Sequence, residues 1–237
     1  MEKLIPFYIN DLAKITNYRS GEIKFGEKML TVPKEVDITE FLKHCDARYV
    51  LFGIPEDIGV RANFGKPGAA SCWESAIRSI ANIQSNQFCK GDELLILGRL
   101  DVSTEMEAVK DLDFNKTADR KKLSELVVEI DKEVAHIICT IVKAGKKPII
   151  IGGGHNNAYG NIKGTALANG KPINAVNFDA HSDFRILEGR HSGNGFSYAY
   201  EEGFLHKYFI FGLHENYTSK KVLSTIRKIE ERVRFNT

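Results

Sequence analysis

Short apolar runs alternate with helical segments along the sequence, and this alternation constrains the fold more than any other feature. The runs are apolar at successive positions, which is typical of strands covered on both faces. They occupy residues 49–54, 94–97, 148–151, 173–178 and 208–211. Apolar residues recur at three-and-four spacing from Thr117 to Ala144, which predicts a long helix, and further helices are expected at 156–169 and 219–233. This order of elements predicts an α/β domain with a mostly parallel sheet, and the polar segment 105–116 is expected to be a surface loop.

Length and composition suit one domain, which we place at residues 1–237. Apolar residues make up 43% of the chain, enough for a substantial core. The 33 Lys and Arg nearly balance the 31 Asp and Glu, so no nucleic-acid or membrane partner is expected. No apolar run approaches the roughly 20 residues of a membrane span. The four cysteines are scattered, which favours reduced thiols in a cytoplasmic protein.

The last residues of the sequence resemble the start of another strand. Val233, Arg234 and Phe235 follow the expected helix, and the sequence stops at Thr237. A parallel sheet that stopped there would keep an open edge. We therefore expect a domain that is incomplete at its C-terminal end, as in a fragment of a longer protein.

Two expected strands are followed directly by residues that can bind metal. His155 follows Gly152, Gly153 and Gly154, which permit a tight turn. Alone, such a histidine is more often a packing or helix-cap residue. Because sites in open α/β sheets form at the carboxyl ends of the strands, His155 is a candidate ligand.

The second strand end carries Asp179, His181 and Asp183. If the extended conformation persists, the i, i+2, i+4 spacing points all three side chains the same way. Two carboxylates and an imidazole on one side of a strand favour a cation between them, whereas the alternative is a solvated polar loop. Oxygen and imidazole donors without thiolate favour Mn²⁺, with Zn²⁺, Fe²⁺, Co²⁺ or Ni²⁺ as alternatives. Asp179 is the candidate to bridge two ions roughly 3.5 to 4 Å apart.

From about Tyr49 to Tyr217 the chain resembles the ureohydrolases, the superfamily of arginase, agmatinase and formimidoylglutamase. The resemblance rests on Gly53–Gly59, Pro67–Ala69 and Ala76–Arg78, on Gly152–His155, and above all on Asp179–Asp183. It implies a three-layer α/β/α fold, a homo-oligomer, and a site in which two Mn²⁺ ions hold a bridging hydroxide. By the resemblance, His155, Asp179 and Asp183 would bind one ion, and Asp179 and His181 the other.

Two departures from the family pattern affect this assignment. Gly154 stands where the family usually has Asp before its first histidine. The family's later Asp-x-Asp pair has no counterpart after Asp183, and the single Asp-x-Asp, Asp111 to Asp113, reads as solvated surface. The second ion would have two protein ligands, fewer than the three usual at a catalytic zinc ion. We therefore expect the chain to hold metal poorly, and a catalytically incomplete binding or assembly module is an alternative to an enzyme.

The segment 190–196 falls where the family contacts its substrate. Aligned on Gly193 and Phe196, the chain has Ser192 in place of the proton-shuttling histidine of arginases and agmatinases, which resembles formimidoylglutamases. His191, one residue earlier, is the candidate proton shuttle, with an exposed loop residue as the alternative. Another alignment matches Ser192 and Asn194 to an arginase stretch that binds the amino-acid end of the substrate.

The expected reaction is hydrolysis of a small linear amidine. The resemblance favours N-formimidoyl-L-glutamate, a compound of histidine degradation, which yields L-glutamate and formamide. Arg185 and Arg190 flank the site and suit the two carboxylates of such a substrate, although surface arginines without a ligand are the alternative. Arginine- or agmatine-type guanidino hydrolysis is the alternative reaction.

Overall fold

The computed structural model describes residues 1–237, which form two compact units. The first comprises Met1–Asp57, Gly68–Glu107 and Thr140–Gly153, and the second comprises Ile58–Pro67, Ala108–Cys139 and Gly154–Thr237. The expectation of a single domain stays a prediction.

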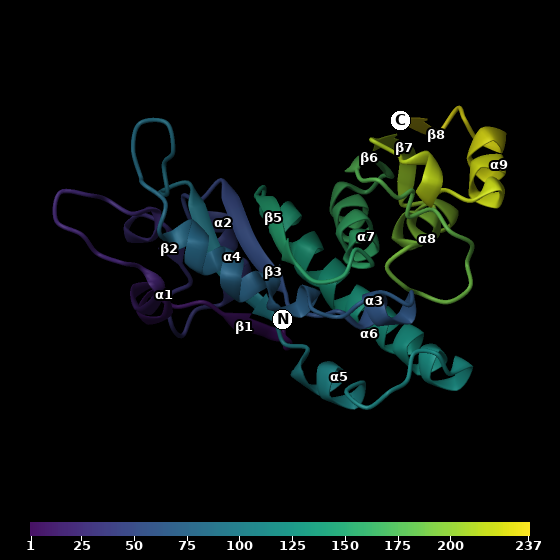
Figure 1. The fold of residues 1–237 in the computed structure, drawn as a ribbon. Helices are drawn as coiled ribbons and strands as arrows, with labels where there is room; N and C mark the ends of the chain where they lie inside the picture. Colours follow the sequence, from purple (N-terminus) through teal and green to yellow (C-terminus); the bar gives the residue numbers. More distant parts are fainter. The chain divides into compact units, whose positions relative to one another are not determined.

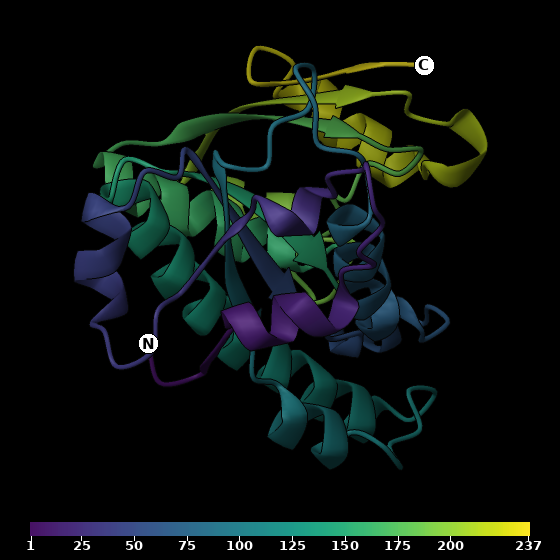
Figure 2. The same ribbon diagram turned by 90° about the vertical axis from the view of Figure 1, so that its left-hand side faces the viewer.

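The first unit is built on a five-stranded sheet (Figures 1 and 2). Its strands are β1 (Leu4–Pro6), β2 (Leu30–Thr31), β3 (Tyr49–Ile54), β4 (Leu94–Leu100) and β5 (Lys147–Gly152). The order is β1-β4-β3-β5, with β2 also on β4, and every pairing is parallel except that of β1 with β4. Its helices are α1 (Ile9–Ile15), α2 (Ile38–His44) and α4 (Cys72–Ala81), with α5 (Ser103–Ala108) at the boundary of the units. Leu12 of α1 and Trp73 of α4 join one buried cluster with Leu51 and Ile96 of the sheet, so these helices cover one sheet face.

The second unit is built on a three-stranded parallel sheet with the order β6-β7-β8. Its elements are α3 (Ile58–Ala62), β6 (Ile173–Phe178), α7 (Asn157–Asn169), α8 (Gly195–Glu201), β7 (Leu205–Phe211), α9 (Lys220–Lys228) and β8 (Val233–Asn236). The long helix α6 (Thr117–Lys143) lies mostly in this unit and ends in the first. Tyr159 of α7 and Phe196 of α8 join a buried cluster with Tyr208 and Ile210 of β7, so one face of this sheet is covered.

The predicted α/β class with a mostly parallel sheet is confirmed. Each of the five predicted runs lies within a strand, and the strand resemblance at 233–235 corresponds to β8. The long helix is α6, Gly145 follows it with φ of 76°, and the predictions at 156–169 and 219–233 correspond to α7 and to the shorter α9. The short elements β1, β2, α1 to α3, α5 and α8 were not predicted, because they are too short to show a period. α4 was missed although Trp73, Ile77 and Ala81 recur at helical spacing and are buried.

Two expectations about exposure and loops were wrong. β6 is not covered on both faces, because Val176 is 72% exposed and Phe178 83% exposed. The side chains of this strand alternate between a covered and an uncovered face, as in any strand with one free face. The segment expected as a loop from residue 105 begins inside α5, and only its later part is a turn.

The remaining expectations concern membranes and thiols. No helix combines the length and the apolar composition that crossing a bilayer requires. All four cysteines are free thiols in the structure. Three of them are half-buried, and Cys72 is exposed at the start of α4.

Candidate metal centre

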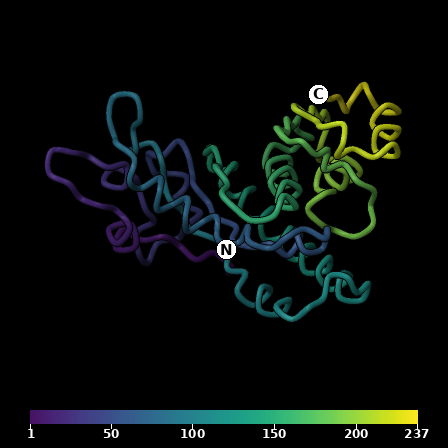
Figure 3. The backbone as a smooth tube through the Cα atoms, viewed as in Figure 1, coloured from purple at the N-terminus to yellow at the C-terminus, as the bar shows by residue number.

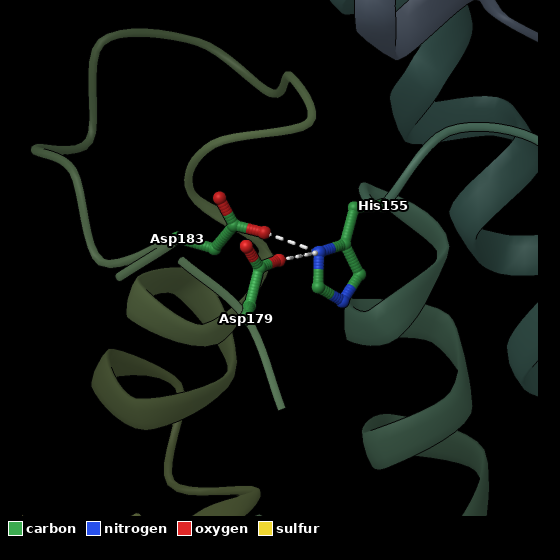
Figure 4. A group of neighbouring side chains, drawn as sticks. All are labelled: His155, Asp179 and Asp183. Carbon is green, nitrogen blue, oxygen red and sulfur yellow. Dashed lines mark ion pairs between the residues drawn. The ribbon is translucent and has the colours of Figure 1, made fainter. Parts of the chain in front are cut away.

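Three predicted ligands converge at the carboxyl end of β6. His155 lies just before α7, and Asp179 and Asp183 lie in the loop after β6 (Figure 4). Their donor atoms all lie within 4.8 Å of one another. His155 Nδ1 is 3.1 Å from Asp179 Oδ2 and also pairs with Asp183 Oδ2. No other group of three His, Cys, Asp or Glu side chains in the chain converges in this way.

The loop reaches this geometry by a turn and not by continuing the strand. β6 ends at Phe178, and Asp183 has a left-handed backbone with φ of 44°. This conformation costs a non-glycine residue free energy, although aspartate tolerates it better than most. The i, i+2, i+4 argument for a common direction is therefore wrong in its geometry, while the convergence of Asp179 and Asp183 that it anticipated is present.

Hydrogen bonds to β7 and the loop after it fix the same turn. The Asp179 amide donates to the Phe211 carbonyl at 3.1 Å, and the His214 amide donates to the Ala180 carbonyl at 2.9 Å. The buried Tyr208 hydroxyl donates to the Ser182 carbonyl at 2.8 Å. Both sides of the turn are therefore tied to the core of the unit, which holds the two carboxylates in place.

The charges at the centre favour a bound cation. Burial lowers the pKa of His155, but its hydrogen bond and Coulombic attraction to Asp183, together with Asp179, outweigh burial, so the pKa is raised overall. Two carboxylates thus share a single imidazole nitrogen that can donate one hydrogen bond. One imidazole and two carboxylates form a hard donor set that fits Mn²⁺.

His181 lies beside this group without belonging to it. Its Nδ1 is 3.3 Å from Asp179 Oδ1, the oxygen that does not face His155, and its ring stacks on Tyr217 at 4.9 Å. A second ion would find Asp179 and His181 here, which are two donors. Asp111 and Asp113 supply none, because they lie in the turn between α5 and α6, where Asp113 accepts hydrogen bonds from Asn115.

The glycine before His155 is required by a close approach. A Cβ atom on Gly154 would lie 2.1 Å from Asn156 Oδ1, and one on Gly59 would also lie 2.1 Å from it. The buried amide of Asn156 thus occupies the space that side chains would take at both positions. A side chain at residue 154 would therefore require Asn156 to move.

Arg190 is buried and engaged on several sides. It is 3% exposed, and its Nε donates to Asp131 Oδ2 of α6 at 2.8 Å. Its other nitrogens donate to Asn156 O at 3.0 Å and Asn194 Oδ1 at 2.7 Å, and the guanidinium lies 4.8 Å from the Tyr159 ring centre. These contacts favour a structural role, in which Arg190 holds the loop in place. They do not favour the predicted role in binding substrate.

Asn194 and His191 are also turned inward. Asn194 is fully buried, and its amide donates to the carbonyls of Ile186 and Gly189. His191 is 4% exposed, so the alternative of an exposed loop residue is wrong. Its Nδ1 accepts from the Gly193 amide at 3.1 Å, which places the ring proton on Nε2, 3.3 Å from Glu188 Oε1. Burial lowers the pKa of His191, and the attraction of Glu188 only partly offsets this.

Arg185 and Ser192 are the predicted substrate residues that stay accessible. A cavity of about 250 Å³, which we call the metal pocket, is lined by His181, Asp183 and Arg185 among others. Arg185 is 53% exposed and lies 3.5 Å from Glu188. Ser192 accepts a hydrogen bond from Asn63 Nδ2 at 3.2 Å. Its own amide donates to the Gly59 carbonyl, which fixes the turn.

Sequence reasoning missed three residues of the site. Asn63 and Tyr217 line the metal pocket, and Phe196 places its ring edge-on to His155 at 5.6 Å. Asn63 lies between two segments of the N-terminal signature, but an amide in a glycine-rich stretch gives no specific signal. Tyr217 follows the last predicted strand and could be assigned only from its stacking on His181.

A comparison with protein-family models gives one match. The model of the arginase family matches residues 47–233, which is most of the chain. Among curated proteins, the chain is 27% identical over 192 residues to a formimidoylglutamase of Chromobacterium violaceum, covering 79% of this chain and 55% of that protein. It is 31% identical over 147 residues to a formimidoylglutamase of Klebsiella pneumoniae, covering 62% and 39%. The chain therefore spans about half the length of the curated relatives it matches, or less.

Solved structures agree on the fold. The Bacillus subtilis formimidoylglutamase superposes with a TM-score of 0.67 at 17% identity, over 94% of this chain and 62% of that one. A Trypanosoma cruzi formiminoglutamase determined with Mn²⁺ superposes with a TM-score of 0.64 at 19% identity, over 90% and 64%. Figure 3 traces the backbone that these superpositions compare.

Proposed function

Because the chain belongs to the arginase family, we propose that it is the metal-binding part of a manganese-dependent hydrolase of linear amidine C–N bonds. The observation that carries the proposal is the convergence of His155, Asp179 and Asp183 at the end of β6. N-formimidoyl-L-glutamate is the proposed substrate, because the curated relatives described above are formimidoylglutamases and no histidine stands at position 192. Water adds to the amidine carbon, the C–N bond to the glutamate nitrogen breaks, and that nitrogen leaves with a proton.

The three ligands would hold the ion, and His181 would contribute beside it with Asp179. When bound, manganese supplies a Lewis acid that activates water and stabilises the charge that develops on the substrate. Asp179 and Asp183 fix the orientation of the His155 ring, and Phe196 packs against its edge.

Arg185 would bind a carboxylate of the substrate. Its guanidinium is half exposed at the edge of the metal pocket and can form a paired hydrogen bond with a carboxylate. Glu188, which neutralises it in the free protein, would give way to the substrate carboxylate. Ser192, next to Asn63, stays a candidate contact with the substrate. Arg190, Asn194 and His191 would stabilise the conformation of the loop through their buried hydrogen bonds.

Turnover on a substrate panel tests the proposal. The manganese-loaded chain is assayed on N-formimidoyl-L-glutamate, arginine, agmatine and guanidinobutyrate, with release of formamide or urea as the readout. We expect hydrolysis of N-formimidoyl-L-glutamate, and its loss in Asp183→Asn. Turnover of arginine or agmatine alone would overturn the substrate assignment.

A second candidate function is a catalytically incomplete module that serves binding or assembly. The observation in its favour is the donor count, since only Asp179 and His181 are placed for a second ion. The same panel separates the two functions, because a module binds metal weakly and turns over none of the four compounds.

The proposal also covers location and assembly. We propose a cytoplasmic enzyme of histidine degradation that forms a homo-oligomer. Light scattering behind a sizing column would show a monomer if the assembly is wrong.

A further inference from the structure

A second cavity, which we call the cationic pocket, adjoins the metal pocket in the same unit. It has a volume of about 370 Å³. Its charged lining consists of Arg120 and Lys121 of α6 together with Arg185 and Glu188 of the loop after β6. Asn63, Arg185 and Glu188 line both pockets, so Arg185 stands between the metal ligands and α6.

The cationic pocket has an excess of positive charge. Three cations face one carboxylate, and Glu188 is already shared between Arg185 at 3.5 Å and His191 at 3.3 Å. Lys121 has a partner on α6, Glu125, but at 3.9 Å and with both side chains exposed, so that ion pair contributes little. The carboxylates of the protein therefore neutralise the positive charge of this pocket only in part. An anion bound there would be attracted by the remaining positive charge.

Arg120 is held ready for such an anion. Its guanidinium lies over the Phe64 ring at 4.4 Å, and its Nη1 donates to the Phe114 carbonyl at 3.3 Å. The side chain is half-buried and keeps further N–H donors for a ligand. A guanidinium already fixed by a ring and a carbonyl loses little conformational entropy when it binds a carboxylate.

We propose that the cationic pocket is a carboxylate subsite, in which Arg120 and Lys121 bind the acidic end of the substrate beyond Arg185. The inference rests on the proposed function and extends it. With the amidine of such a substrate at the metal ligands, Arg185 would take the α-carboxylate, which lies on the carbon next to the amidine nitrogen, and Arg120 the γ-carboxylate at the far end. Agmatine has no carboxylate and would gain nothing from this subsite, so Arg120 becomes a determinant of specificity.

Binding of L-glutamate tests the subsite separately from catalysis. Calorimetry on the manganese-loaded full chain is performed for wild type, Arg120→Gln, Lys121→Gln and Lys122→Gln. Lys122 is the matched control, because it is an exposed neighbour on α6 that lines neither pocket. We expect affinity to fall roughly tenfold in R120Q and about threefold in K121Q, with K122Q within about twofold of wild type.

Equal affinity in R120Q and K122Q, or no glutamate binding by wild type, would overturn the subsite. Sulfate that binds as tightly as glutamate would overturn its assignment to carboxylates. Circular dichroism confirms folding of each variant, and Arg120→Lys, which keeps the charge, should recover part of the affinity. If the chain hydrolyses N-formimidoyl-L-glutamate with a KM that R120Q leaves unchanged, the subsite fails while the proposed function stands. If R120Q weakens glutamate binding in a chain without turnover, the function fails and the subsite stands.

Discussion

The ion pair between Arg190 and Asp131 is deeply buried in the second unit. Both side chains are 3% exposed. Removal of one partner from a buried pair typically costs about 3 to 5 kcal/mol, because the other charge loses its compensation. We expect Arg190→Ala to lower the free energy of unfolding by about that amount in urea denaturation.

The control for Arg190→Ala is Lys132→Ala on the same helix as Asp131. Lys132 pairs with Glu129 at 2.6 Å, but both side chains are more than half exposed. An exposed pair contributes about 1 kcal/mol or less. Equal losses in the two variants would show that Arg190 does not hold the loop.

His191 gives the protein a specific sensitivity to acid. Burial, opposed by Glu188 and reinforced by Arg185 and Arg190, holds its pKa below the ordinary value of 6.5. The unfolded chain therefore binds a proton at a higher pH than the folded protein does. Stability contributed by neutral His191 is present above pH 6.5 and is lost as the pH falls from there toward the lower folded pKa.

His191→Gln removes this contribution of His191 to the pH dependence of stability. The wild-type free energy of unfolding should decline more steeply than that of the variant between about pH 7 and pH 5. His44→Gln, which removes an exposed imidazole, serves as the control and should parallel wild type. Parallel curves for wild type and H191Q would contradict the buried neutral state.

At the scale of elements, the turn between β5 and α7 depends on the packing of Asn156 against Gly154. A methyl group at Gly154 would overlap Asn156 Oδ1 at 2.1 Å. We expect Gly154→Ala to destabilise the protein by about 1 to 3 kcal/mol, as overpacking does. In the background Asn156→Gly the same change should cost less, and a double-mutant cycle in denaturant measures the difference. Additive effects would mean that Asn156 does not set the identity of residue 154.

The uncovered face of the β6–β7 sheet is the second feature at this scale. Phe178 is 83% exposed and stacks on Phe211 at 5.2 Å, and Val176 is 72% exposed. A contiguous apolar patch of this kind binds hydrophobic dyes. Phe178→Ser should roughly halve the fluorescence of bound anilinonaphthalene sulfonate, whereas Phe88→Ser, at an 88% exposed residue, should change it little. Equal effects of the two changes would show that the sheet face is not the binding surface.

The sequence predicted elements well where a long period or a continuous apolar run existed. β3 and β6 were predicted with their exact bounds, and α6 within one residue. The exposure of the outer face of β6 could not be predicted, because the sequence INAVNF places apolar residues on both faces of the strand. Whether a face is exposed depends on whether another segment of the chain packs against it.

The convergence of the candidate metal ligands was predictable from residue type, while the roles of their neighbours were not. His155, Asp179 and Asp183 come together as a set. Arg185 and Arg190 look equivalent in sequence, yet one is accessible and the other pairs with Asp131, which lies 59 residues away along the chain. Burial and long-range partners decide such roles, and a single sequence records neither.

At the scale of the whole molecule, the chain offers one candidate ion site with three donors and one partial site. His155, Asp179 and Asp183 provide three donors, and the second position adds only His181 to the shared Asp179. A chain with this donor count should bind one Mn²⁺ reversibly, and the second ion more weakly still. Extended dialysis should then remove most of the metal.

Manganese titration followed by electron paramagnetic resonance of the free ion tests this claim most directly. We predict one saturable site per chain that Asp183→Asn abolishes. Asparagine is suited there because it tolerates the left-handed backbone of residue 183. Lys132→Gln, at an exposed residue away from the site, should bind like wild type. Two ions per chain at full occupancy after dialysis, or an isotherm that D183N leaves unchanged, would contradict it.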